Sequence, residues 1–123
     1  MRYVVLIYET AANFESRKQR EGDPYFAAWR LYYQALVEAG AFVTGAPLKD
    51  AGTATTVRLK DGRGHVQDGP FAEAKEQLGG FMILELPSLD AALEWAARCP
   101  AAATGALEVR PMDVDTHEHV VAP

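Results

Sequence analysis

Asp68 is the residue of this sequence whose type and position best suit acid–base chemistry. It follows the extended segment His65-Val66-Gln67 and precedes Gly69-Pro70, so it stands at a rigid turn. A carboxyl group at the mouth of a cavity loses hydration, which raises its pKa and suits it to act as a general acid or base. Asp before Gly-Pro is also a standard turn former, and both interpretations stay open. We take Asp68 as the candidate catalytic residue.

Three further side chains are candidates for ligand binding. Tyr8 ends the first apolar segment, and its hydroxyl can hydrogen-bond a ligand. Arg110 lies in the last expected strand, where its guanidinium can hold a carboxylate or a phosphate. Trp29 belongs to a wide aromatic stripe that can line a ligand site. The alternatives are a core tyrosine, a surface ion pair of Arg110 with Glu108 or Glu85, and a helix that simply packs on a sheet.

Several other residues are of types that occur in metal sites and active sites. His117 and His119 can chelate a metal along an extended strand, but they lie in the tail with no matching cluster, so we predict no metal site and no cofactor. His65 precedes Asp68 by three residues, which places the two side chains on opposite faces of a strand. The role of Glu9 stays open. No phosphate loop, zinc-finger spacing, nucleophile elbow or dinucleotide fingerprint is present.

Length and composition limit the class of protein to which this chain can belong. A chain of 123 residues with 49% hydrophobic residues predicts one compact domain over 1–123, with 113–123 as a C-terminal tail. The net charge of -5 argues against nucleic acid as a direct partner. The cluster Arg17-Lys18-Arg20 is flanked by acidic residues and is interpreted as a solvated loop. The first apolar run is too short to span a membrane, so we expect a cytoplasmic protein with no membrane partner.

Two very apolar segments are the clearest strand predictions. Tyr3 to Tyr8 and Phe81 to Leu86 lack the polar alternation of a half-solvated strand. Residues 9–22 are polar without clear periodicity and predict a loop, with room for one helical turn. If residues 71–78 are helical, Phe71 and Leu78 lie on one face of a short segment that Gly79-Gly80 ends. The expected elements are strands at 2–8, 42–44, 54–59, 65–67, 81–86 and 107–112 and helices at 24–39 and 89–99.

Turn chemistry predicts where these elements begin and end. Asp23-Pro24 offers an N-cap acid followed by Pro at the first helical position, and Gly40 ends that helix. Ser88 caps the second helix, and Asp61-Gly62 favours a tight hairpin turn. Cys99 is the single cysteine, so an internal disulfide is excluded, and we expect a buried structural thiol.

The order of the elements predicts an α+β fold, a ferredoxin-like antiparallel sheet with two main helices on one face. The other face would then expose apolar side chains from both clear strands, and a soluble protein does not leave such a patch in water. The simplest cover is a second copy, sheet against sheet, related by a two-fold axis. We therefore predict a homodimer, a dimeric α/β barrel with a space between its two sheets.

The segment from Asp68 to Gly80, DGPFAEAKEQLGG, closely resembles the DGPF family, a branch of the YCII-related proteins. The motif usually has Thr where this chain has Ala74. Flanking matches extend the resemblance over nearly the whole chain: Leu6-Ile7-Tyr8, Thr53 to Arg58, Trp95 to Pro100, and Glu108 to Pro111. The resemblance implies a dimeric barrel of ferredoxin-like subunits but no settled reaction, since related barrels include muconolactone-isomerase-like enzymes, haem-degrading monooxygenases and ligand-binding regulators.

Two functional hypotheses follow. The first is a dimeric barrel that binds a small, partly apolar molecule, with isomerase or lyase-like acid–base chemistry centred on Asp68. The second is a non-catalytic regulatory or protein-interaction module, which the resemblance implies because members of this branch are often encoded beside extracytoplasmic-function sigma factors. An enzyme should have an enclosed pocket with at least two convergent ionisable groups, whereas a regulator needs only an exposed apolar groove.

Overall fold

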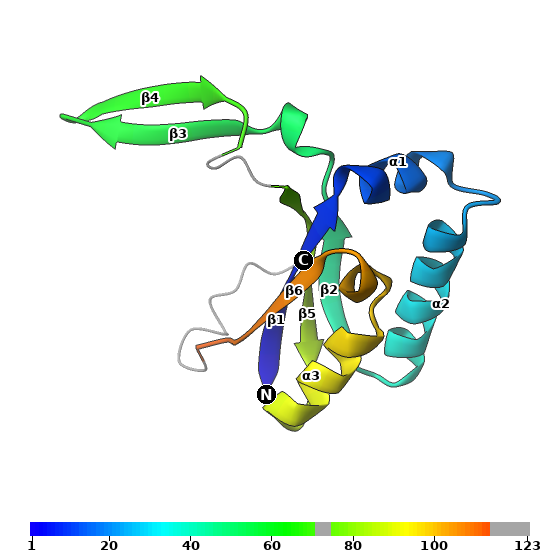
Figure 1. The fold of residues 1–123 in the computed structure, drawn as a ribbon. Helices are drawn as coiled ribbons and strands as arrows, with labels where there is room; N and C mark the ends of the chain where they lie inside the picture. The colour runs from blue at the N-terminus through cyan, green and yellow to red at the C-terminus, as the bar shows by residue number, and fades with distance from the viewer. Residues whose placement is uncertain (71–74, 114–123) are drawn as a thin grey trace.

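The structure is a computed structural model, and it describes residues 1–70 and 75–113. Within these residues the chain forms two β-sheets and three α-helices, with two short 3-10 turns (Figure 1). In chain order the elements are β1 (Arg2–Thr10), α1 (Ala11–Gln19), α2 (Pro24–Glu38), β2 (Phe42–Pro47), η1 (Ala51–Thr53), β3 (Thr55–Lys60), β4 (Arg63–Asp68), β5 (Glu76–Glu85), α3 (Leu89–Arg98), η2 (Pro100–Ala103) and β6 (Ala106–Pro111). In this described part, no helix has the length and apolar character needed to cross a membrane.

The larger sheet has the strand order β2-β5-β1-β6, and each neighbouring pair is antiparallel. Val5 at the centre of β1 stands opposite Met82 of β5 on one side and Val109 of β6 on the other. Helix α2 connects β1 to β2, and α3 connects β5 to β6. This is the ferredoxin-like arrangement, and the predicted α+β fold class is confirmed.

The two faces of the larger sheet are covered differently. All three helices lie on one side of it (Figure 1), and the side chains of β1 that point there, Tyr3, Val5 and Ile7, are buried. The alternate residues Val4 and Leu6 point to the helix-free side and are half-buried. The core on the covered side consists of Tyr3, Val5, Ile7, Tyr32, Leu36, Ala41, Met82, Leu84, Leu86, Ala92, Cys99 and Ala101.

Strands β3 and β4 form a separate two-stranded sheet, which we call the hairpin arm. Figure 1 shows the arm projecting from the larger sheet toward the side opposite the helices. Asp61 and Gly62, with φ of 52° and 75°, make its turn, as the sequence predicts. Val57, Leu59 and Val66 are 63%, 79% and 68% exposed, and Val57 stands directly opposite Val66. The arm therefore has apolar surface that is exposed in the single chain. An isolated two-stranded hairpin is at best marginally stable in water.

The segment 9–22, for which the sequence predicts a loop, contains helix α1. A capping box begins it, because Thr10 Oγ1 accepts a hydrogen bond from the Asn13 backbone N–H (3.2 Å) and Asn13 Oδ1 accepts one from the Thr10 N–H (2.9 Å). Only Asn13 and Phe14 of α1 are buried. The helix therefore has no apolar stripe of helical period to indicate it in the sequence.

Strand β5 begins at Glu76, where the sequence predicts the last turn of a short helical segment. Gly79 and Gly80 consequently lie inside the strand instead of before it. They are needed there because neighbouring atoms approach closely: a Cβ on Gly80 would lie 2.9 Å from the Ala46 carbonyl oxygen. The first part of the predicted helical segment, 71–74, lies outside the described residues.

Helical spacing in the sequence predicts that Leu89, Ala92, Leu93 and Ala96 form the buried face of α3, and the structure agrees with this only in part. Ala92 and Ala96 are buried as predicted, but Leu89 and Leu93 are 45% and 48% exposed. Trp95 packs against the core in their place. One large aromatic ring thus covers the area that two leucines would otherwise fill, and the helix turns its leucines toward solvent.

Candidate functional site

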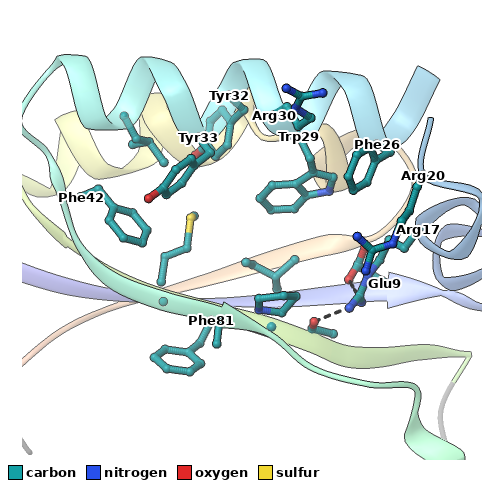
Figure 2. A pocket seen from close by; sticks show the side chains of 18 residues that line it. Glu9, Arg17, Arg20, Phe26, Trp29, Arg30, Tyr32, Tyr33, Phe42 and Phe81 are labelled. Atoms are coloured by element: carbon teal, nitrogen blue, oxygen red, sulfur yellow. Dashed lines mark hydrogen bonds and ion pairs between the residues drawn. The ribbon is translucent and has the colours of Figure 1, made fainter. Parts of the chain in front are cut away.

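A cavity of about 490 Å³ lies between α2 and the covered face of the larger sheet (Figure 2). Helix α2 forms its roof, and β1, β2 and β5 form its floor. Met82 of β5 and Ile7 of β1 supply apolar floor atoms. The aromatic residues that line it on the helix side and at its end are Phe26, Trp29, Tyr32, Tyr33 and Phe42.

The start of α2 fixes where this aromatic wall stands. The Asp23 carboxylate accepts hydrogen bonds from the backbone N–H groups of Tyr25 (2.8 Å) and Phe26 (3.2 Å), and Pro24 occupies the first helical position, as predicted. From there the rings of Tyr25, Trp29 and Tyr32 follow each other edge to face, with centroids 6.4 Å and 5.7 Å apart. Such a series of T-shaped contacts holds the ring of Trp29 at a set angle to the cavity.

Glu9, near the end of β1, supplies a buried carboxylate at one end of the cavity. Its side chain is only 3% exposed, and both oxygens are occupied. Oε1 accepts a hydrogen bond from Arg17 Nη1 at 2.9 Å in an ion pair, and Oε2 accepts one from the Tyr25 hydroxyl at 2.5 Å. The opposite charge and the two donors offset the large cost of removing this carboxylate from water.

Arg17 of α1 ties the same end of the cavity together. Besides Glu9, its guanidinium donates to the Gly79 carbonyl at 3.3 Å and to the Leu48 carbonyl at 2.6 Å, and it lies over the ring of Phe14. Gly79 leaves the space that the carboxylate fills, since a Cβ there would stand 2.1 Å from Glu9 Oε1. The positions of Glu9 and Gly79 are therefore mutually dependent.

The electrostatics of this end keep a proton on the tyrosine. Burial, followed by the hydrogen bond to the Glu9 carboxylate, raises the pKa of Tyr25 well above its usual value of 10.0. Tyr25 therefore remains a hydrogen-bond donor into the alkaline pH range as well as at neutral pH. The site can present a carboxylate, held by one cation and one neutral donor, to a molecule bound against the aromatic wall.

The structure places the three predicted ligand-binding residues in two different locations. Trp29 lines the cavity. Tyr8 points to the helix-free side of the sheet, where it borders a shallow depression with Lys75 and Glu76. Arg110 stands opposite Val4 on that side, and its side chain is 68% exposed and paired with Glu108. Within one subunit these residues do not converge.

Asp68 lies at the end of β4, at the root of the hairpin arm, where it is exposed and stands opposite Thr55. His65 stands opposite Arg58, so His65 and Asp68 point to opposite faces of the arm, as predicted. Asp68 does not line the cavity under α2. His117 and His119 lie outside the described residues.

Sequence reasoning does not place Glu9 or Arg17, two residues of the cavity end, in a site. The sequence leaves the role of Glu9 open, although Glu9 continues the alternation of Tyr3, Val5 and Ile7, a period-two series that points it to the covered face. Arg17 belongs to a cluster interpreted as a solvated loop. That interpretation is wrong for Arg17, because the helix around it turns its side chain inward to three acceptors.

The fold and the cavity together define a ferredoxin-like α+β protein with room for a small molecule beneath its first long helix. The chain belongs to the YCII-related family: the family model of the YCII-related domain matches residues 1–113. This confirms the relationship that the segment Asp68 to Gly80 predicts.

The chain is similar to one curated protein in sequence and to one solved structure in fold. An "Uncharacterized protein R00369" of Rhizobium meliloti (strain 1021) is 37% identical over 114 residues, which is 91% of this chain and 92% of the relative. A solved structure, 5-chloro-2-hydroxyhydroquinone dehydrochlorinase (TftG) from Burkholderia phenoliruptrix AC1100 in complex with 2,5-dihydroxybenzoquinone, matches with a TM-score of 0.56. It is 18% identical and covers 92% of this chain and 94% of its own. At that identity the similarity shows the shared fold.

Proposed function

We propose that this protein binds a small, partly apolar molecule in the cavity under α2, and that Glu9 is the acid–base group of the site. The observation that carries this proposal is a carboxylate that is almost completely buried at the end of an aromatic-walled cavity. The volume of about 490 Å³ falls in the range of roughly 300 to 1,000 Å³ found for small-molecule sites.

A purely structural Glu9 explains these observations less well. Replacing a buried ion pair by packed apolar residues is often neutral or stabilising, so stability alone does not call for a charge at this position. An apolar residue at position 9 would continue the inward series of Val5 and Ile7. The chain instead has a carboxylate there, with Arg17 and Tyr25 placed to satisfy it.

The chemistry that such a group supports is proton transfer to and from a bound molecule, as in isomerases and lyases. Glu9 would accept the proton, and Arg17 and Tyr25 would hold the carboxylate in position before and after the transfer. The structurally related TftG is a dehydrochlorinase captured with 2,5-dihydroxybenzoquinone, a small ring compound, which supports a ligand of this size.

Proton exchange tests the role of Glu9 without knowledge of the product. Small aromatic and unsaturated compounds that raise the melting temperature are incubated with the protein in D₂O, and deuterium incorporation at carbon is followed by NMR. Glu9→Gln keeps the shape of the side chain and should slow exchange by about 100-fold or more. The exposed Glu21 provides a matched control, because Glu21→Gln makes the same chemical change outside the cavity. Equal exchange by Glu9→Gln and wild type contradicts the assignment.

Asp68 remains the second candidate for the acid–base role. It is exposed in the single chain, so it needs a second copy to enclose it. Asp68→Asn in the same exchange assay separates the two candidates: a loss of exchange in that variant, with Glu9→Gln fully active, transfers the role to Asp68. A stable Asp68→Asn protein with unchanged exchange leaves Asp68 as a turn residue.

We also propose that the chain pairs with a second copy through the helix-free face of the larger sheet. That face carries the half-buried side chains of Val4, Leu6, Tyr8 and Phe81, and no described helix covers it. The hairpin arm projects on the same side with its apolar residues exposed (Figure 1), so a second copy seated on the sheet would also meet the arm. Both surfaces are then removed from water together.

Mass measurement by light scattering at several concentrations tests this pairing. The wild type should elute with twice the chain mass of 13.4 kDa, and Leu6→Glu, which places a charge in the centre of the proposed interface, should elute as a single folded chain. Leu31→Glu is the matched control, since Leu31 is 68% exposed on the outer surface of α2. A wild-type protein that is monomeric at every concentration contradicts the proposal.

A further inference from the structure

Arg20, at the junction between α1 and α2, differs from the other charged residues around the cavity. Its backbone has φ of 54° and ψ of -110°, a sparsely populated conformation for a residue with a side chain. Among the described residues, the other non-glycine residue with positive φ is Asp61, where the hairpin turn requires that conformation. With this backbone conformation Arg20 lines the cavity.

The guanidinium of Arg20 points into the cavity beside Arg17 and Glu9 (Figure 2). The two arginines are engaged differently. Arg17 donates to Glu9 and to two backbone carbonyls. Across residues 1–70 and 75–113, no carboxylate forms an ion pair with Arg20. Its donors are therefore available to a molecule in the cavity.

The charges around the cavity contrast with those of the whole chain. The chain has a net charge of -5, yet the charged residues that line the cavity are three arginines, Arg17, Arg20 and Arg30, and one glutamate, Glu9. Glu9 is neutralised by Arg17. Figure 2 shows Arg30 extending from the outer side of α2, which leaves Arg20 as the cavity cation that is neither paired with Glu9 nor directed away from the cavity. A positive cavity in a negative protein favours an anion.

We propose that the ligand class of this cavity is the small aromatic carboxylates, with the carboxylate on the Arg20 guanidinium and the ring against Trp29. This inference rests on the proposed function of the same cavity. The planar fork of a guanidinium matches a carboxylate in geometry and gives two charge-assisted hydrogen bonds. Arg20 and Trp29 line the same cavity, so a molecule that fills it can contact both. A single free guanidinium suits a singly charged group.

Binding of acids and their neutral amides tests the class directly. Benzoate and phenylacetate are titrated against benzamide and phenylacetamide, and the readouts are tryptophan fluorescence and calorimetry. In the wild type each acid should bind about tenfold or more tightly than its amide, because a hydrogen bond to a charged partner exceeds one to a neutral partner by that factor. The preference should weaken at high salt.

The variants assign the preference to one residue. Arg20→Gln should weaken acid binding about tenfold and leave amide binding unchanged. Arg20→Lys, which keeps the charge but loses the fork, should restore part of the preference. Arg63→Gln is the control, because it removes an equal charge from the exposed hairpin arm.

The two levels of the proposal fail in different ways. Acids and amides that bind equally well to the wild type, or an acid preference that survives Arg20→Gln, overturn the ligand class and leave the cavity as a binding site. If none of these compounds binds, the proposal that the cavity is a binding site is overturned. The same holds if the compounds bind the Trp29→Ala variant as tightly as the wild type.

Discussion

The two faces of the larger sheet are made by the same strands and have opposite characters. On the helix-covered face, β1 places Tyr3, Val5 and Ile7 in the core and Glu9 at the end of a cavity. On the helix-free face, the alternate residues are apolar and half-buried, and the charged pairs lie at the rim. The covered face therefore joins the core to the candidate site, whereas the helix-free face carries the apolar surface on which we propose that a second copy packs.

The largest expected difference between the faces appears when the same truncation is made on each. Leu36, on the covered side, is completely buried, so Leu36→Ala should lower the free energy of unfolding by about 2–5 kcal/mol at any protein concentration. If two copies pair as proposed, the second copy covers Leu6, so Leu6→Ala should cost most at high protein concentration, where the wild type pairs, and least on dilution, where both proteins are single chains. Urea titrations at low and high protein concentration measure both. A concentration-independent loss for Leu6→Ala contradicts the distinction.

A second test concerns the fit between Gly79 and the carboxylate. The new Cβ of Gly79→Ala would overlap Glu9 Oε1 and must displace it, so the unfolding free energy should fall by about 1–3 kcal/mol and ligand binding should weaken. Gly64→Ala is the control, because no atom lies within 4 Å of a Cβ built there. If both variants have the same stability, Gly79 does not position Glu9.

Alkaline pH provides a test confined to the covered face. Burial raises the pKa of the Cys99 thiol from 9.0 to about 12. Above pH 9 the unfolded chain loses a proton that the folded chain keeps, so stability falls as pH rises from 9 to 12, by up to about 1.4 kcal/mol per pH unit from this group. Unfolding measured from pH 7 to 10 should show a shallower decline for Cys99→Ala. Parallel curves for variant and wild type would mean that the thiol is not buried in solution.

The smallest effect is expected at the rim of the helix-free face. Arg110 and Glu108 form an ion pair whose side chains are 68% and 39% exposed, so Glu108→Gln should change the unfolding free energy by less than about 0.5 kcal/mol. The change should vanish at high salt. A loss above 1 kcal/mol would show that this pair lies in a desolvated interface, and it would strengthen the case for pairing of copies.

Local sequence signals predict most of the fold. The apolar runs at Tyr3 and Phe81 specify the central strands, Asp23-Pro24 specifies the start of α2, and Asp61-Gly62 specifies the hairpin turn. Each signal acts within a few residues, so no knowledge of distant contacts is needed. For residues 9–22 the sequence predicts a loop with at most one helical turn, because α1 has no apolar stripe and is anchored by Arg17, whose backbone acceptors lie far along the chain.

The candidate site is harder to predict for the same reason. The cavity exists only where α2, β2 and β5 meet, and the whole hairpin arm separates β5 from the other two elements in the sequence. Trp29 can be predicted as a lining residue because the aromatic residues of its stripe all lie within one helix. Glu9 was identified only as an open question, since its partners, Arg17 and Tyr25, are 8 and 16 residues away. Its alternation with Ile7 and Val5 was the available signal.

The single guanidinium of Arg17 links parts of the molecule that would otherwise be independent. It joins the strand end that carries Glu9, the neighbouring strand at Gly79, and Leu48 in the connection that leads from β2 to the hairpin arm. An engineer who changes this residue to widen the cavity will also loosen the base of the arm. Lysine cannot replace it, because one ammonium group lacks the planar fork that reaches all three acceptors. Redesign of the cavity must therefore leave Arg17 in place.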